Sequence, residues 1–120
     1  MLINLKTILS GKEKQAVGSF NIYSYETIKG VCKAVEKTKM PAIISFGASY
    51  LKNMSLETVK YITEEASKDL PADVALHLDH CKDIEIIKAA IEAGFTSVMY
   101  DGSALPFEEN VKNSRAVANM

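Results

Sequence analysis

The fold of this chain is indicated most clearly by the stretch Val74-Ala75-Leu76-His77-Leu78-Asp79-His80. Its first part is mostly apolar, which is typical of a strand buried in a parallel sheet. An Asp-His pair then follows at the point where the strand is expected to end. A purely structural protein has little need for such a pair, so we expect a strand over residues 74–78 with chemistry at its carboxyl end.

Other short β-rich runs alternate with amphipathic helical windows along the rest of the chain. The helical windows begin with residues whose side chains can cap a helix, namely Ser24, Ser55 and Asp83. Gly94 follows the third window, at the position where helices commonly end with a residue in the left-handed conformation. Pro106 lies just inside the start of a fourth window. The sequence predicts strands over residues 16–22, 42–46, 74–78 and 96–100, a short helix over residues 4–9, and an apolar side of the last helix made by Phe107, Val111 and Ala118.

The repeated strand-helix order predicts an α/β fold with a parallel sheet and right-handed crossovers. Two architectures contain such a sheet. One is a (β/α)8 TIM barrel, of which this chain supplies roughly the first four βα units, and the other is a small doubly wound open sheet. Periodicity alone does not separate the two.

Length and composition restrict the class of protein further. The chain has 120 residues, a formal net charge of −1, 48% hydrophobic residues and 24% charged residues, which fits a single globular domain. The charge gives no reason to expect nucleic acid or an anionic membrane as a partner, and no apolar run approaches the ~20 residues that span a bilayer. No export signal begins the chain, and Cys32 and Cys81 make no disulfide framework, so we expect a cytoplasmic protein with reduced thiols.

Polar residues follow every predicted strand. Asn21 follows the first strand, Ser45 and Ser49 follow or end the second, the Asp-His pair ends the third, and Asp101 ends the fourth. Because the carboxyl ends of parallel strands meet at one edge of the sheet, these side chains are expected to lie close together.

The pattern His77-Leu78-Asp79-His80 carries the chemistry that we consider first. Strand alternation puts His77 and Asp79 on one side and His80 on the other, until the strand gives way to loop. His80 could then turn inward as a ligand for Zn²⁺, with Asp79 as a proton-transfer group. Three alternatives stay open: His77 as a hydrogen-bonded core residue, Asp79 as a cap, and Cys81 as either a thiolate ligand or a small loop residue.

Several runs of the sequence resemble the class II fructose- and tagatose-bisphosphate aldolases, which are (β/α)8 barrels. The resemblance covers nearly the whole chain in order, as the N-terminal half of one barrel domain over residues 1–120. The runs are Val17-Gly18-Ser19-Phe20-Asn21, residues 74–80, Ala93-Gly94-Phe95-Thr96-Ser97-Val98-Met99-Tyr100-Asp101-Gly102-Ser103 and Leu105-Pro106-Phe107-Glu108-Glu109-Asn110.

The resemblance implies roles for particular residues. His80 resembles one of the histidines that hold the catalytic zinc, and Asp79 resembles the proton donor to the aldehyde oxygen. Asp101 resembles a carboxylate that some members use for a second metal, divalent or monovalent, although an N-cap or an Asx turn before Gly102 explains it equally. Asn21 resembles a polar residue near the substrate, with a turn residue as the alternative. Ser49 is assigned only weakly to the phosphate end of the substrate.

The implied reaction is the aldol cleavage or condensation of fructose or tagatose 1,6-bisphosphate, which yields glycerone phosphate and glyceraldehyde 3-phosphate, with zinc stabilising the enediolate. Two departures from the family matter. Gly47 stands where members usually carry a serine after Pro41, and the chain contains only His77 and His80 as possible imidazole ligands. The other zinc ligands and the phosphate loops are therefore expected from the remainder of the barrel or from another copy, in a homo-oligomer.

Two other functions compete with the aldolase hypothesis. The missing ligands favour a non-catalytic half barrel that serves for binding or assembly. A flavodoxin-like nucleotide binder needs a phosphate-cradling loop after the first strand, and Asn21-Ile22-Tyr23-Ser24-Tyr25 lacks the glycines for one.

Overall fold

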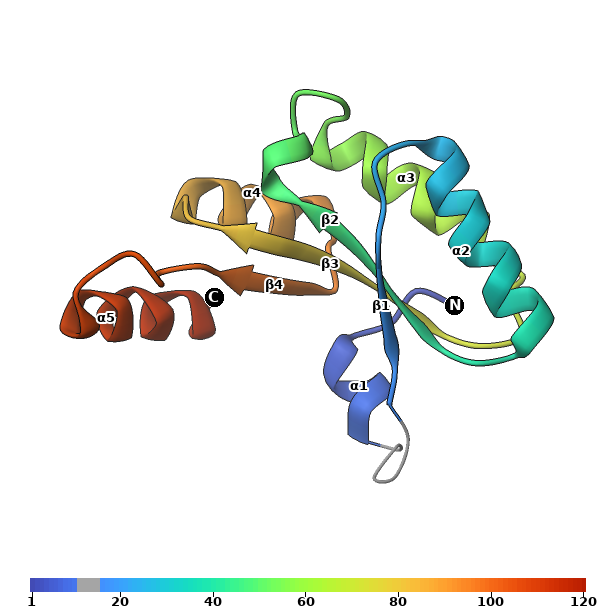
Figure 1. Cartoon of the computed structure of the whole chain (residues 1–120), viewed down its shortest axis with the longest axis horizontal. Helices are drawn as coiled ribbons and strands as arrows, with labels where there is room; N and C mark the ends of the chain where they lie inside the picture. Colours follow the sequence, from blue (N-terminus) through green and yellow to red (C-terminus); the bar gives the residue numbers. More distant parts are fainter. Residues whose placement is uncertain (11–15) are drawn as a thin grey trace.

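The computed structural model describes residues 1–10 and 16–120, and within them four strands form one parallel sheet. The strands lie side by side in chain order, β1-β2-β3-β4 (Figure 1). A doubly wound sheet reverses its strand order at a switch point, whereas a barrel keeps consecutive strands adjacent. The order therefore favours the barrel, and the prediction of an α/β fold is confirmed. The strands are β1 (Gly18–Asn21), β2 (Ala42–Gly47), β3 (Val74–Cys81) and β4 (Ser97–Tyr100).

A helix follows each strand, as the sequence predicts. The helices α2, α3 and α4 pack in succession over one side of the sheet and against one another (Figure 1). The helical elements are α1 (Leu5–Ser10), α2 (Tyr25–Thr38), the short 3₁₀ helix η1 (Ala48–Tyr50), α3 (Leu56–Ser67), α4 (Ile84–Ala93) and α5 (Phe107–Ala118).

The predicted caps are confirmed. The Ser24 hydroxyl accepts a hydrogen bond from the backbone N–H of Thr27, and the Ser55 hydroxyl accepts one from Thr58. The Asp83 carboxylate accepts hydrogen bonds from two backbone N–H groups of the first turn of α4, at 2.8 and 3.4 Å. Gly94 follows α4 with φ of 95°, a conformation that costs glycine little.

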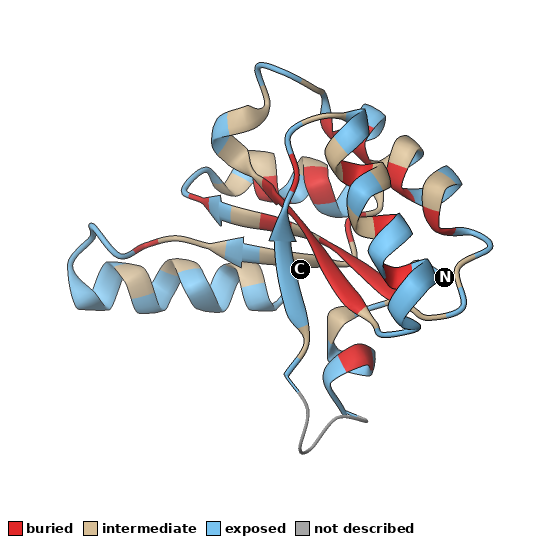
Figure 2. Cartoon of the chain, turned by 45° about the vertical axis from the view of Figure 1, so that its right-hand side comes forward, coloured by how far each residue is buried: buried red, intermediate tan, exposed pale blue. Residues whose placement is uncertain are grey.

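The hydrophobic core lies between the sheet and α2, α3 and α4. Strand register directs Ile44 and Phe46 of β2, and Leu76 and Leu78 of β3, to this side, where all four are 0% exposed. The buried stripe runs along the central strands in Figure 2. The helices contribute fully buried residues at helical spacing, including Ile28, Val59 and Ile87.

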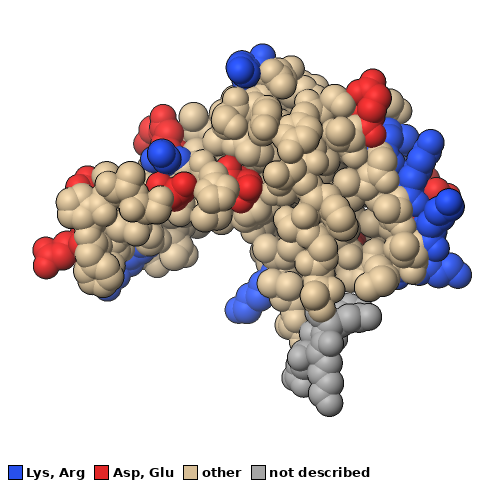
Figure 3. All heavy atoms as spheres, viewed as in Figure 1, with Lys and Arg blue, Asp and Glu red and all other residues tan. Residues whose placement is uncertain are grey.

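The opposite side of the sheet is more polar. The register places Asn21, Ser45, His77 and Ser97 in one row across the four described strands. Within these strands Asp79, two residues beyond His77, is the only Asp, Glu, Lys or Arg. In the view of Figure 3, charged side chains lie mainly around the periphery, with basic ones along the edge where α2 lies. A carboxylate in the sheet is thus an exception that calls for a functional reason.

All four strands differ from the predicted ranges at one or both ends. The first strand is shorter than residues 16–22, because its pairing with β2 is limited to Gly18–Asn21 at the sheet edge. The second strand extends by one residue to Gly47, and the fourth begins one residue later than predicted. The third strand extends to Cys81, because pairing with β4 resumes after an irregularity.

The prediction for the last helix is wrong in part. Pro106 is the N-cap residue of α5 and lies outside it. Phe107 is 81% exposed and Val111 is 40% exposed, so the expected apolar side is not buried. In the part of the chain that the structure describes, neither residue belongs to the hydrophobic core or packs against it. Among the described helices, none combines the length and apolar character needed to cross a membrane.

The cap of α4 gives a test of the fold. We expect Asp83→Ala to lower the free energy of unfolding by about 0.5–2 kcal/mol, because two N–H groups lose their acceptor. Asp69→Ala changes an exposed turn residue and is the matched control, with an expected effect within about 0.5 kcal/mol. Urea denaturation followed by circular dichroism measures both, and equal effects of the two substitutions would contradict the capping role.

Candidate active site

A β-bulge at the carboxyl end of β3 shapes the site. Leu78 pairs with Val98 and Cys81 pairs with Tyr100, so Asp79 and His80 together face the single residue between those partners. His80 adopts φ of 50°, in the left-handed region, which costs about 1–3 kcal/mol for a residue other than glycine. Bulges of this kind redirect side chains and are frequent beside active sites. Simple alternation would have put the two side chains on opposite faces of the sheet.

Because of the bulge, Asp79 and His80 line the same cavity. The cavity has a volume of about 400 Å³ and lies at the carboxyl edge of the sheet. It is lined by the five residues to which the family resemblance gives a metal, catalytic or substrate-binding role: Asn21, Ser49, Asp79, His80 and Asp101. The predicted clustering at one edge is therefore observed, while the individual roles stay predictions.

His80 and Asp101 form the best-defined contact of the site. The Nδ1–H of His80 donates to Oδ2 of Asp101 over 3.1 Å, although 21 residues separate them in the sequence. The backbone N–H of Asp101 donates to the carbonyl oxygen of Cys81 at 2.8 Å, which brings Asp101 beside the end of β3. Oδ1 of Asp101 accepts hydrogen bonds from the N–H and hydroxyl of Ser103, at 3.1 and 2.6 Å. Asp101 thus forms the Asx turn that the sequence allows and also orients His80.

The electrostatics of this contact favour the charged form of both partners. Hydrogen bonds from Ser103 and His80 hold the pKa of the Asp101 carboxyl far below its usual range. The hydrogen bond to Asp101, with the nearby charge of Asp79, raises the pKa of His80 above its ordinary value. Asp101 is therefore ionised at neutral pH. Because its contact with His80 uses Nδ1, Nε2 is the ring nitrogen that becomes available to a metal once the charged ring loses its second proton.

Asp79 lies beside a second histidine. Nε2 of His77 is 3.7 Å from Oδ1 of Asp79, and Nδ1 of His77 is hydrogen-bonded to the Ser97 hydroxyl at 2.8 Å. Burial lowers the pKa of His77, which favours the neutral ring. His77 is thus a hydrogen-bonded interior residue on its Nδ1 side, as the core-histidine alternative states, and on its Nε2 side it faces Asp79.

Asn21 and Ser49 reach the cavity from neighbouring strands. Asn21 ends β1 in register with Ser45, and Ser49 lies in η1 directly after β2. The rings of Tyr23 and Tyr50 pack edge to face with centroids 4.6 Å apart, which ties the loop after β1 to η1. Asn21 and Ser49 are both exposed, as expected of residues that bind a ligand.

Cys81 does not join the site. It is 1% exposed within the hydrophobic core, and its thiol donates to the backbone carbonyl of Asp83 at 3.3 Å. Burial raises the pKa of this thiol, so it stays protonated. Of the two alternatives for Cys81, the structure favours the small structural residue over the thiolate ligand.

Some residues of the cavity wall were not foreseen from the sequence. Tyr50 and Lys82 line the cavity beside the predicted residues. Ser97, the partner of His77, was not foreseen either. Lys82 directly follows β3, and Ser97 is the first residue of β4. Their positions next to the ends of predicted strands could have indicated both residues from the sequence.

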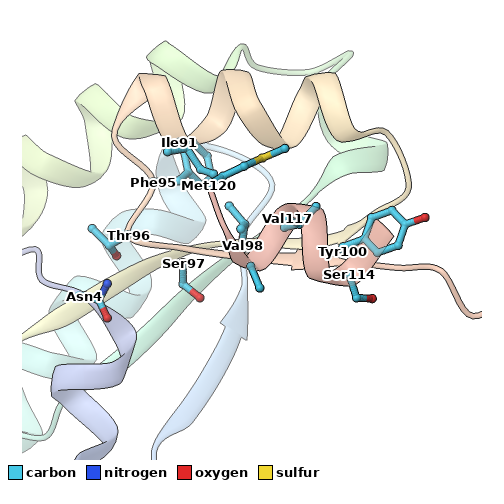
Figure 4. Close-up of a pocket in the computed structure, with 11 residues that line it drawn as sticks. Asn4, Ile91, Phe95, Thr96, Ser97, Val98, Tyr100, Ser114, Val117 and Met120 are labelled. Atoms are coloured by element: carbon cyan, nitrogen blue, oxygen red, sulfur yellow. The ribbon is translucent and has the colours of Figure 1, made fainter. Parts of the chain in front are cut away.

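A different cavity lies beside the edge strand β4. It measures about 500 Å³ and is lined largely by apolar residues of α4, β4 and α5, among them Ile91, Val98 and Val117 (Figure 4). The side chains in this close-up include none of Asn21, Ser49, Asp79, His80 and Asp101. We therefore assign chemistry to the polar cavity at the carboxyl edge and not to this apolar one.

The donor set has the character of part of a metal site. A metal-bound histidine commonly donates its other ring N–H to a carboxylate, as His80 donates to Asp101. The His80 side chain is 64% exposed, so Nε2 is accessible from the cavity. Among residues 1–10 and 16–120 there is no group of three or more His, Cys, Asp or Glu side chains placed to hold one ion. The described residues thus fit one imidazole ligand of a zinc site, and the other ligands must come from elsewhere.

Comparison with known proteins gives a consistent result. The family model described as "Fructose-bisphosphate aldolase class-II" matches residues 4–120. A sulfofructosephosphate aldolase of Alkalicoccus urumqiensis is 43% identical over 98% of this chain and 42% of its own length. A fructose-bisphosphate aldolase of Geobacillus stearothermophilus is 40% identical over 92% of this chain and 40% of its own length.

The solved structures agree with the sequence comparison. The crystal structure of the YdjI aldolase from Escherichia coli K12 superposes with a TM-score of 0.90 at 32% identity, over 99% of this chain and 47% of the other. The chain thus spans less than half the length of these relatives. The four βα units are accordingly the N-terminal part of a TIM barrel.

The His80–Asp101 contact predicts a measurable change in titration. Asp101→Asn removes the negative charge that stabilises the imidazolium, so the pKa of His80 should fall toward or below its ordinary value. Ser103→Ala is the control, because it removes a donor to Asp101 and leaves the charge facing His80 in place. Histidine NMR signals followed against pH in the metal-free protein measure both, and an unchanged midpoint for Asp101→Asn would contradict the assigned contact.

Proposed function

Since this chain belongs to the class II fructose-bisphosphate aldolase family, we propose that residues 1–120 are the N-terminal half of one metal-dependent aldolase domain. The observation that carries the proposal is the bulge in β3, which brings a carboxylate and a metal-type imidazole to one cavity. A binding or assembly module has no need of that pair.

The proposed metal ligand of this chain is His80, through Nε2. When bound, zinc supplies a Lewis acid for the negative charge that develops on the substrate as its carbon–carbon bond breaks. Asp101 holds the imidazole in the orientation and tautomer that leave Nε2 available. The carboxylate of Asp101 is also the group that would bind a second cation, as the family resemblance implies.

Asp79 is the proposed proton donor. During cleavage its carboxylate would take the proton of the substrate hydroxyl whose oxygen becomes the aldehyde oxygen, and during condensation the resulting carboxylic acid would return that proton to the same oxygen. The side chain is 25% exposed at the cavity wall, which lets one oxygen face the substrate while bulk water has limited access.

The proposed substrate is a ketose bisphosphate, fructose or tagatose 1,6-bisphosphate. Asn21 and Ser49 offer an amide and a hydroxyl at the rim of the cavity for hydrogen bonds to substrate oxygens. Lys82 adds a cation to the same wall, which suits an anionic substrate.

A second substrate candidate comes from one relative. The 43% identical relative is named a sulfofructosephosphate aldolase, and Gly47 here occupies the position where family members usually carry the serine of the phosphate end. The corresponding substrate is a ketose that carries a sulfonate group in place of one phosphate group. The ratio of kcat/KM for the bisphosphates and for sulfofructose phosphate decides between the two.

The remaining parts of the site are proposed to come from the rest of the barrel, in the same polypeptide or in another copy. The apolar cavity beside β4 and the exposed Phe107 and Val111 of α5 are surfaces that a following βα unit could cover. The same units would bring the further zinc ligands and the phosphate loops.

The division of roles between Asp79 and His80 can be tested in the complete aldolase. Asp79→Ala should lower kcat by about 10²–10⁴-fold with zinc content unchanged, because the residue handles protons and not metal. His80→Ala is the matched variant and should lower zinc content as well as activity. Metal analysis and a coupled assay of glycerone phosphate measure both, and loss of stoichiometric zinc from Asp79→Ala would refute the division.

The 120-residue polypeptide alone gives the complementary test. We expect no measurable cleavage with added zinc, weak zinc binding and self-association, because one ligand is present and apolar surface is exposed. Sedimentation, zinc titration and the same assay measure these properties. Robust turnover by a monomer would show that the site has been misplaced.

A further inference from the structure

His77 lies behind the proposed proton donor and touches none of the described cavity surface. It is absent from the lining of the cavity, whereas Asp79 is part of it. Its side chain is 14% exposed, and its partners are Ser97 on one ring nitrogen and Asp79 on the other. A histidine with this placement acts on the site only through the carboxylate in front of it.

The contact with Ser97 fixes the imidazole ring. His77 and Ser97 are register partners on β3 and β4, so the backbone itself holds their side chains side by side. The 2.8 Å contact uses Nδ1, which directs Nε2 toward Asp79. When the Ser97 hydroxyl donates to Nδ1 of the neutral ring, the ring hydrogen is on Nε2 and can be donated to the carboxylate.

The geometry at Asp79 leaves room for that donation. Nε2 of His77 and Oδ1 of Asp79 are 3.7 Å apart, somewhat longer than a hydrogen bond. Contacts of this kind are often long without substrate and commonly tighten only when substrate is bound. With one oxygen held by His77, the other oxygen keeps a fixed direction toward the cavity.

We infer that His77 is a positioning residue, which orients Asp79 through Nε2 while Ser97 fixes the imidazole ring. The inference rests on the proposed function, because Asp79 is positioned for a proton transfer only if the protein is an aldolase. It adds two residues, His77 and Ser97, to the parts of the chain that determine the rate of the chemical step.

The test uses the complete aldolase and compares His77→Phe with His77→Gln. Phenylalanine keeps the ring volume and removes both nitrogens, whereas the glutamine amide nitrogen reaches about as far as Nε2 and can still donate. We expect His77→Phe to lower kcat by about 10- to 100-fold, the size typical of lost outer-shell hydrogen bonds, with KM and zinc content unchanged. His77→Gln should recover part of that loss, and Ser97→Ala should lower kcat by a smaller factor.

The control is Thr96→Val, one residue from Ser97. Its hydroxyl accepts a hydrogen bond from the N–H of Leu76 at 2.9 Å and donates to the carbonyl of Leu76 at 3.3 Å, and it contacts neither His77 nor Asp79. Thr96→Val should lower Tm without lowering kcat. If His77→Phe does not fold, His77→Gln and Ser97→Ala carry the comparison.

A double-mutant cycle separates positioning from a general structural effect. In an Asp79→Ala background His77→Phe should cause little further loss of kcat, because the group it positions is already gone. The same fold loss in both backgrounds would overturn the inference, as would a change confined to KM, zinc content or Tm. If the unsubstituted enzyme is active and His77→Phe has the same kcat, only this inference is overturned. If the unsubstituted enzyme shows no aldolase activity, the proposed function and this inference are overturned together.

Discussion

Hydrogen bonding between β3 and β4 shifts register after Leu78, and the arrangement of the candidate site depends on that shift. Two residues of β3 are accommodated opposite one residue of β4, and His80 takes a left-handed backbone conformation to allow it. The strain is offset by the hydrogen bond to Asp101 and by ladder pairing that resumes at Cys81. Without the shift, Asp79 and His80 would point to opposite faces of the sheet, and no cavity could contain both.

The two histidines of the site differ because their surroundings differ. His80 is exposed, lies against an ionised carboxylate and has a raised pKa, so in the metal-free chain its charged form is favoured. His77 is largely buried, lies against a hydroxyl and has a lowered pKa. One strand thus provides an exposed imidazole suited to a metal and an interior imidazole suited to holding a neighbour, with the Asp79 carboxylate, the proposed proton-transfer group, between them.

The rest of the fold supports this edge of the sheet. The buried side of β2 and β3 packs against α2, α3 and α4 with apolar residues, so the strands are held firmly in register. The other side carries the polar row Asn21, Ser45, His77 and Ser97, and Asn21 at the end of that row lines the cavity. A rigid apolar layer on one side and a polar layer on the other allow functional side chains to be placed accurately without depending on flexible loops.

The sequence by itself determined the order of strands and helices, the caps at Ser24, Ser55 and Asp83, the left-handed Gly94, and the family to which the chain was likened. It also determined which residues meet at the carboxyl edge, since the end of each parallel strand lies on the same side of the sheet. These features depend on neighbours within a few positions along the chain, or on the general geometry of parallel sheets. Only the tertiary structure decided the bulge, the contacts of His80 with Asp101 and of His77 with Ser97, and the exposure of Phe107. The bulge and the two contacts depend on the alignment of β3 with β4, whose contacting residues are some 20 positions apart in the sequence. The exposure of Phe107 depends on which elements pack against α5. No local sequence pattern encodes the strand alignment or the packing.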